Sequence, residues 1–284
     1  MLYLWGGGFC HDSSLVEGRT APRAPDCGNG ATLRPVAAPG STVEYFKGNN
    51  PDGKSYRDFM VVERCIPEYR IKTAERYQLL QRTLERFEEA KTFGSLIEVP
   101  EEDAAPLKML VDELEQLVRA GDVMQKPAAE MLLPYVQQAW ILAQRYDAVI
   151  ANPPYMGSKG MNAPLKKFAK DACPNSKSDL FAIFMERAFS LLRPNGYNAQ
   201  INMQSWMFLS SYEKLREWLL HNATIITMAH MGSRAFDSIS GEVVSTTAFV
   251  IENAAFPDYS GAYIRLVDAK SEAEKRRLLL EAIQ

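Results

Sequence analysis

Short apolar runs alternate with helical patterns from residue 146 to residue 251, and this alternation limits the fold more than any other feature of the chain. The runs are short and apolar, as buried strands are. They occupy residues 146–151, 197–203, 224–231 and 243–251. Helical patterns at about residues 178–192 and 211–221 separate the first three runs. The sequence therefore predicts an α/β fold with a mostly parallel sheet.

The last two runs are joined by a segment that carries no helical pattern. Parallel neighbours need a crossover of a dozen or more residues, usually a helix, whereas antiparallel neighbours do not. We therefore expect residues 224–231 and 243–251 to pair antiparallel at the edge of the sheet.

The segment before the sheet is helical. Apolar positions recur at spacings of three and four over residues 69–91 and again over 107–118, which is typical of amphipathic helices. Gly121 stands where the second helix would stop with a left-handed residue. A third helix at residues 128–145 contains Pro134, which we expect to kink or divide it because proline cannot donate a backbone hydrogen bond.

Composition narrows the class of protein. Apolar residues make up 46% of the chain and charged residues 24%, which excludes intrinsic disorder over the whole length. The chain has neither an apolar run of membrane-spanning length nor a signal-peptide pattern, so we expect a cytoplasmic protein without a membrane partner. The four cysteines lie far apart and the histidines lack ligand partners at metal spacing, so no metal site is expected. The net charge of -3 gives no overall attraction to nucleic acid, and such a partner would need a local basic surface.

The tetrapeptide Asn152-Pro153-Pro154-Tyr155 directly follows the first predicted strand. A Pro-Pro pair should occur roughly 0.7 times in a chain of this length, and the flanking Asn and aromatic residue make the full motif far rarer. Open α/β sheets bind ligands at the carboxyl ends of their strands, where this motif lies. The motif is therefore a candidate active site; the alternative is a proline-stiffened turn that Asn152 opens and in which Tyr155 only packs.

These residue types suit chemistry at the exocyclic amino group of a base. The lone pair of such a nitrogen is delocalised into the ring, which makes it a poor nucleophile. The Asn152 side-chain oxygen and the Pro153 carbonyl could accept both N–H bonds and favour a more nucleophilic geometry. Consecutive prolines hold that carbonyl rigidly. Tyr155 offers a flat face for a base that has been extruded from its duplex.

The sequence resembles the amino-methylating DNA methyltransferases, which use S-adenosylmethionine and carry an Asn/Asp-Pro-Pro-Tyr/Phe motif. Longer matches make it similar to the adenine-specific methyltransferases of BREX phage-defence systems. The matching segments are YDAVIANPPYMGSK (146–159), KSDLF (177–181), QSWMFLSS (204–211) and ISGEVV (239–244). The resemblance covers roughly residues 69–284. It implies methylation of adenine N6 in double-stranded DNA with a flipped adenine, S-adenosylmethionine as cofactor, and other BREX proteins as partners.

The resemblance also implies a partial fold. Residues 146–284 would form the C-terminal half of a class I, Rossmann-like methyltransferase sheet, preceded by a helical segment at 42–145. The first three strands of that sheet, which carry the cofactor, are missing. We therefore expect residues 146–151 to form an exposed edge strand, which would make the chain marginally stable and prone to self-association.

Residues 1–41 are rich in Gly and Pro and are expected to be irregular, with an origin foreign to the enzyme. Within them, the segment 26–30 (DCGNG) has the composition of an acidic, glycine-rich cofactor loop. The two prolines and two arginines of residues 18–25 cannot form the buried strand that such a loop must follow. The cofactor-binding residues therefore stay unknown at this level.

Two further residues are candidates for substrate binding. Lys159 is the first of five lysines that follow the motif; their roles are phosphate contact or a merely solvated face. Phe249, on the last predicted strand, resembles the late-strand aromatic that stacks on the base in the family. Core packing is the alternative for Phe249, because its neighbours are apolar.

Two other functions stay open. This motif also serves enzymes that methylate RNA or the amide nitrogen of glutamine in proteins. A catalytically silent binding module in a defence complex is the second possibility, and the missing cofactor half favours it.

Overall fold

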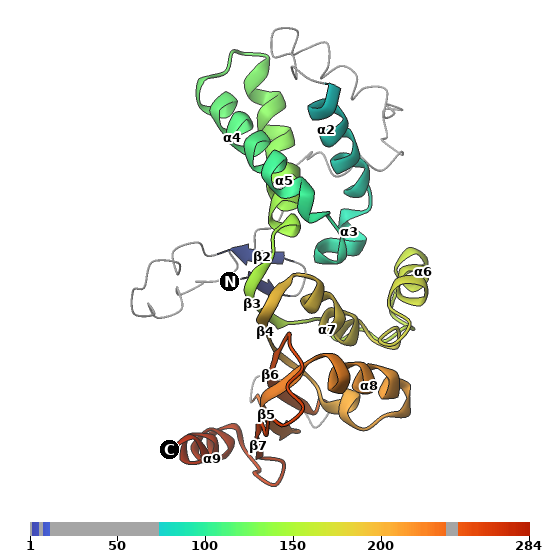
Figure 1. Cartoon of the computed structure of the whole chain (residues 1–284), viewed down its shortest axis with the longest axis vertical. Coiled ribbons are helices and arrows are strands. Elements are labelled where there is room, and N and C mark those ends of the chain that lie inside the picture. Colours follow the sequence, from blue (N-terminus) through green and yellow to red (C-terminus); the bar gives the residue numbers. More distant parts are fainter. Residues whose placement is uncertain (1, 6–7, 12–73, 237–243) are drawn as a thin grey trace. The chain divides into compact units, whose positions relative to one another are not determined.

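The computed structural model describes four stretches of the chain, residues 2–5, 8–11, 74–236 and 244–284 (Figure 1). The chain divides into two compact units. The sheet unit contains Met1–Ala21 and Arg145–Gln284, and the helical unit contains Pro22–Gln144. Among the described helices, none has the length and apolar character needed to cross a membrane.

A seven-stranded sheet organises the sheet unit, in the order β2-β1-β3-β4-β6-β5-β7. The strands are β1 (Leu2–Trp5), β2 (Gly8–His11), β3 (Tyr146–Asn152), β4 (Leu192–Met203), β5 (Thr224–Gly232), β6 (Thr246–Glu252) and β7 (Ala262–Arg265). β1, β3 and β4 are parallel, β6 is antiparallel to both β4 and β5, and β7 is parallel to β5. The four predicted strands are present as β3 to β6, and the predicted α/β fold is confirmed.

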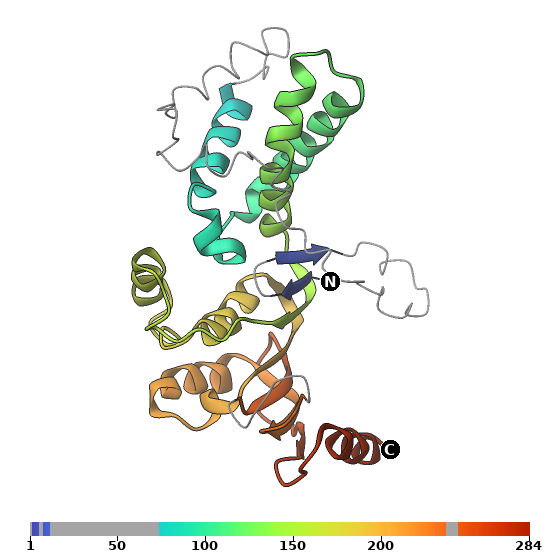
Figure 2. The ribbon, with the colours of Figure 1, turned by 180° about the vertical axis from the view of Figure 1, so that it is seen from behind.

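Helices cover both faces of this sheet. Figures 1 and 2 show α7 (Leu180–Ser190) and α8 (Glu213–Asn222) on one side and α9 (Glu272–Ile283) on the other. α7 and α8 confirm the helices expected at 178–192 and 211–221. A shorter helix, α6 (Ala163–Ala172), precedes α7. The turns η5 (Gln204–Met207) and η6 (Ser210–Tyr212) connect β4 to α8.

The expectation that residues 146–151 form an exposed edge is wrong. β3 pairs with β1 on one side, from Leu2 opposite Val149 to Trp5 opposite Asn152, and with β4 on the other. The physical reason is that β1 pairs in parallel with β3 along the edge that was expected to be free. β1 and its antiparallel partner β2 also correct the expectation of a wholly irregular N-terminus. The predicted antiparallel pairing of β5 with β6 is confirmed, but β7 covers β5, so this pair is not at the edge.

Buried amides on β4 hold α7 against the sheet. The side chains of Asn198, Gln200 and Asn202 are almost fully buried. Asn198 Nδ2 donates to the carbonyl of Met185 at 3.2 Å, and Gln200 Nε2 donates to the carbonyl of Phe184 at 3.2 Å. Gln200 also hydrogen-bonds to the other two amides: its Nε2 donates to Asn198 Oδ1 at 2.8 Å, and its Oε1 accepts from Asn202 Nδ2 at 3.0 Å. Because a buried amide without a partner is costly, these bonds fix the position of α7 along β4.

From residue 74 onward, the helical unit is built mainly from three helices. They are α2 (Ala74–Arg86), α4 (Ala104–Ala120) and α5 (Gln125–Ala143), with the short segments α3 (Ala90–Phe93), η3 (Gly94–Leu96) and η4 (Glu101–Asp103) between α2 and α4. Their buried faces carry the predicted apolar positions, among them Leu80, Leu84, Leu107 and Leu114. The helices expected at 107–118 and 128–145 are therefore confirmed. In the described part of 69–91, a turn at residues 87–89 separates α2 from α3.

Two details of the helical unit differ from expectation. Gly121 is extended, with φ -71° and ψ 158°, instead of left-handed. Its glycine character matters because a Cβ atom there would lie 2.4 Å from the carbonyl oxygen of Leu117. Pro134 lies inside α5 without dividing it. Because Pro134 has no N–H, the carbonyl of Glu130 lacks its helical hydrogen bond. Both residues are exposed, so water can bond to that carbonyl instead.

Candidate active site

The motif Asn152-Pro153-Pro154-Tyr155 lies where β3 ends, beside the carboxyl end of the parallel strand β4. Asn152 is the last residue of β3 and is exposed, whereas Pro153 is buried. A buried proline behind an exposed amide keeps the backbone fixed while leaving the amide accessible. The structure therefore places the motif at the carboxyl ends of the parallel strands β3 and β4, as the sequence predicts.

Tyr155 is held at both ends of its side chain. Its hydroxyl donates a long hydrogen bond, 3.4 Å, to the carbonyl of Ile201 on β4. Its ring packs edge-to-face on Phe181 of α7, with centroids 6.2 Å apart. Burial raises the pKa of the Tyr155 hydroxyl, so the phenol stays neutral at physiological pH. The ring is thus an uncharged aromatic surface that contacts with β4 and α7 hold in place, three residues after Asn152.

A second aromatic contact continues this row. Phe181 is fully buried and contacts Tyr212 of η6, with centroids 5.7 Å apart. Burial, helped by the negative charge of Asp179, raises the pKa of Tyr212 to about 12, although a hydrogen bond with Ser205 opposes the shift. The row joins the motif to α7 and to the turn after β4, so Tyr155 rests on a packed support.

Asp179 connects the motif to the start of α7. Its Oδ1 atom accepts hydrogen bonds from the backbone N–H of Met156, at 2.9 Å, and from that of Phe181, at 3.3 Å. The N–H of Leu180 donates to the carbonyl of Met156 at 3.0 Å. Burial raises the pKa of the Asp179 carboxyl, and the backbone hydrogen bonds only partly offset this. Asp179 therefore caps α7 and anchors the residue after Tyr155 with one oxygen atom.

The sequence predicts the helix that begins near Asp179, but it does not predict the contact of Asp179 with Met156. The contact with Met156 crosses 23 positions and leaves no pattern in a single sequence. The cap itself was recognisable, because an Asp directly before an apolar helical run is typical of a helix start.

The two candidate substrate-binding residues have different surroundings. Lys159 is exposed in the loop that follows the motif. Phe249 is only 3% exposed and packs edge-on against Trp206 of η5, with centroids 5.6 Å apart. The structure therefore does not bring Phe249 to the surface beside Asn152, and its surroundings favour core packing.

The described residues do not form the cradle that a class I enzyme uses for S-adenosylmethionine. That cradle needs a strand, a glycine-rich loop and then a helix. Here β1 leads into the antiparallel β2 after two residues, so no helix starts at its carboxyl end. The other candidate loop, residues 26–30, lies outside the described part of the chain.

An α/β sheet with Asn-Pro-Pro-Tyr at the carboxyl end of a strand is the arrangement expected from the resemblance to amino-methyltransferases. Residues 65–236 match the family model of the Eco57I restriction-modification methylases. The chain belongs to this family.

Two curated relatives are adenine-specific methyltransferases, in agreement with the family match. The chain is 64% identical over 203 residues to the adenine-specific methyltransferase BrxX of Escherichia coli O9:H4 (strain HS), a match of 72% of this chain and 17% of that protein. It is 48% identical over 143 residues to the adenine-specific methyltransferase PglX of Lacticaseibacillus casei (strain Zhang), covering 50% of this chain and 12% of that protein. The predicted resemblance to BREX-type adenine methyltransferases is confirmed, although the chain matches only a small part of each relative.

Among solved structures, the chain is similar to a nuclease-deletion mutant of the type ISP restriction-modification enzyme LlaGI in complex with a DNA substrate mimic. The TM-score is 0.40 and the identity 18%, over 60% of this chain and 19% of that chain.

Proposed function

We propose that this chain provides the base-positioning part of an S-adenosylmethionine-dependent enzyme that methylates N6 of adenine in DNA, within a BREX phage-defence system. The observation that carries the proposal is the placement of the motif: Asn152 is exposed at the carboxyl end of β3, Pro153 is buried, and contacts with Ile201 and Phe181 hold the Tyr155 side chain. The names of both curated relatives, each an adenine-specific methyltransferase, support the choice of base.

Each residue of the motif has a separate proposed role in holding the adenine that accepts the methyl group. Asn152 Oδ1 accepts one N–H of the adenine amino group and the Pro153 carbonyl accepts the other. Pro154 keeps this carbonyl in place by restricting the backbone on either side of it. Tyr155 stacks on the flipped base, and its neutral phenol adds no charge that would need solvation.

S-adenosylmethionine is the proposed methyl donor and supplies the methyl group when bound. Since the described residues lack its cradle, residues beyond them would hold it. Residues 146–284 are proposed as the C-terminal half of the catalytic domain, residues 42–145 as its helical segment and residues 1–41 as a part foreign to the enzyme. The proposed partners are double-stranded DNA and other BREX proteins, in the cytoplasm.

A chimaera tests this function without requiring a complete cofactor site in the chain. The 203 residues that align with E. coli BrxX would replace the corresponding segment of that protein. The chimaera is incubated with radiolabelled S-adenosylmethionine and with DNA, RNA or protein extract. Label in DNA, found in N6-methyladenine after digestion, is expected. Label found instead in RNA or in glutamine side chains would show that the substrate is RNA or protein. If the chimaera labels nothing while the parent BrxX is active, the silent binding module is favoured.

A further inference from the structure

The residues after the motif form a closed excursion from the sheet, here called the arm (residues 157–178). Its two ends meet: Gly157 forms an antiparallel bridge with Asp179, and the N–H of Ser158 donates to the carbonyl of Ser178 at 3.1 Å. Figures 1 and 2 both show the two connections to α6 running side by side from the start of α7. Because the arm begins two residues after Tyr155, it is fixed next to the candidate active site.

Charge on the arm has the opposite sign to that of the whole chain. The arm contains five lysines and one aspartate, whereas the whole chain has a net charge of -3. All six side chains are exposed: Lys159, Lys166, Lys167, Lys170, Asp171 and Lys177. Within the described structure, none of the five lysines forms an ion pair with a carboxylate. The arm is therefore a concentrated positive surface that the described part of the chain does not neutralise.

The arm is also structurally anchored. Asn162 caps α6 by accepting a hydrogen bond from the N–H of Leu165 at 3.0 Å, and Leu165 and Ala169 bury the opposite face of the helix from its lysines. On the return connection, the hydroxyl of the fully buried Ser176 donates to Glu186 of α7 at 2.8 Å. These contacts give the lysines a defined position relative to Tyr155.

The composition of the arm selects among negatively charged partners. A membrane-binding helix needs exposed large apolar side chains, and residues 157–178 present none. A single-stranded nucleic acid is usually held by exposed aromatic rings, but the one aromatic residue of the arm, Phe168, is half-buried. Lysines without stacking groups are suited to the phosphates of a duplex, which they contact as point charges.

We propose that the arm binds the phosphate backbone of duplex DNA beside the base that the motif holds. This inference rests on the proposed function. It adds a local positive surface that attracts DNA although the net charge of the chain is negative. Each lysine that neutralises a phosphate releases counterions, so the salt dependence of binding counts the contacts. The contacts are independent of base sequence, which allows the test to use any duplex.

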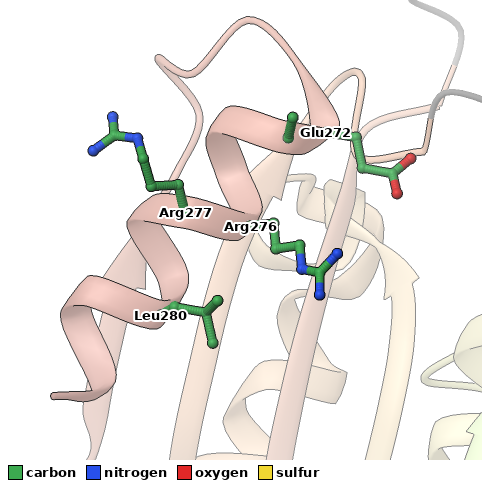
Figure 3. Close-up of a pocket in the computed structure, with 5 residues that line it drawn as sticks. Glu272, Arg276, Arg277 and Leu280 are labelled. Carbon is green, nitrogen blue, oxygen red and sulfur yellow. The ribbon is translucent and has the colours of Figure 1, made fainter.

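The test compares two variants that each lose two positive charges. Lys166→Gln/Lys170→Gln changes one face of α6. Arg276→Gln/Arg277→Gln changes α9, where Figure 3 shows both arginines around a surface pocket with Glu272 and Leu280. Binding of each full chain to a fluorescent duplex is measured by anisotropy between 50 and 200 mM salt, with circular dichroism as a check of folding.

The slope of log K against log salt is expected to become shallower by about 1.8 in the α6 variant, since each lost contact removes about 0.9. If all proteins bind equally at 1 M salt, this slope gives about 60-fold weaker binding at 0.1 M. The α9 variant should bind like the wild type. Equal losses in both variants, or unchanged binding in the α6 variant, would overturn the role of the arm while leaving the proposed methylation intact. Preference of the wild type for single-stranded RNA or anionic vesicles would overturn the choice of partner. A lack of DNA methylation by the chimaera would instead count against the proposed function.

Discussion

Replacement of Asp179 tests whether the carboxylate oxygen, rather than its charge, holds the motif loop. Asp179→Ala removes the acceptor for the N–H groups of Met156 and Phe181. Loss of a helix N-cap costs about 0.5–2 kcal/mol, and the second N–H adds about 1 kcal/mol, so we expect the free energy of unfolding to fall by about 2 kcal/mol. Asp179→Asn keeps an oxygen in the same place and should change stability by less than about 0.5 kcal/mol at pH 7.

The pH dependence of stability, compared between the wild type and Asp179→Asn, tests whether the charge of Asp179 stabilises or destabilises the fold. Burial raises the pKa of Asp179 in the folded state above its ordinary value of 3.8. Ionised Asp179 therefore costs folding free energy above the folded pKa, and this cost disappears below 3.8. As the pH falls from 7 towards 4, the wild type should gain stability relative to Asp179→Asn. Urea unfolding monitored by circular dichroism measures both effects. An Asn variant as unstable as the Ala variant, or an Ala variant as stable as the wild type, would refute the reasoning.

Three more changes have expected outcomes. In the chimaera, Tyr155→Ala should lose about 1–3 kcal/mol of base stacking in methylation kinetics, whereas Tyr155→Phe should be nearly silent because its hydroxyl makes only a long hydrogen bond; equal effects of both would exclude stacking. Asp103→Ala should lower the free energy of unfolding by about 1–2 kcal/mol at pH 7, since Asp103 is buried but its arginine partners are partly exposed. Burial alone would raise the pKa of Asp103, but the contacts with Arg82 and Arg86 outweigh it, so the folded pKa is lowered. The stabilisation by Asp103 is therefore present above pH 3.8 and is lost as the pH falls through the folded pKa. A pH-independent effect of Asp103→Ala would contradict the ion pairs. Gly121→Ala should cost more than about 1 kcal/mol in urea unfolding because its Cβ would lie 2.4 Å from a carbonyl oxygen; an unchanged midpoint would contradict this.

Much of the sheet unit follows from the sequence because its signals are local. Apolar runs bounded by helical patterns predicted β3 to β6, and the motif was placed correctly because it directly follows a strand. β1 was missed because it is only four residues long and lies in a Gly-rich and Pro-rich stretch. A signal was present: two glycines join Leu2–Trp5 to Gly8–His11, as in a two-residue hairpin. Missing this signal produced the incorrect exposed edge.

The supports of the candidate site could not be predicted from one sequence. The anchor between Asp179 and Met156 and the ring contact between Tyr155 and Phe181 join residues that are more than 20 positions apart. Such contacts depend on how α7 packs on β4, which the buried amides of β4 determine. For Phe249, the family resemblance suggested stacking, whereas its apolar neighbours correctly indicated a packed environment.

The central claim is that Asn152 orients an adenine amino group for methylation, and the rate of methyl transfer by the chimaera tests it most directly. Asn152→Ala removes one acceptor of that group, so kcat should fall at least about a hundredfold, equivalent to about 3 kcal/mol. Binding of duplex DNA, measured by anisotropy on the same samples, should change little because the exposed Asn152 side chain is proposed to contact only the flipped base, whereas the lysines of the arm contact the DNA backbone. An unchanged rate of N6-methyladenine formation in Asn152→Ala would contradict the claim.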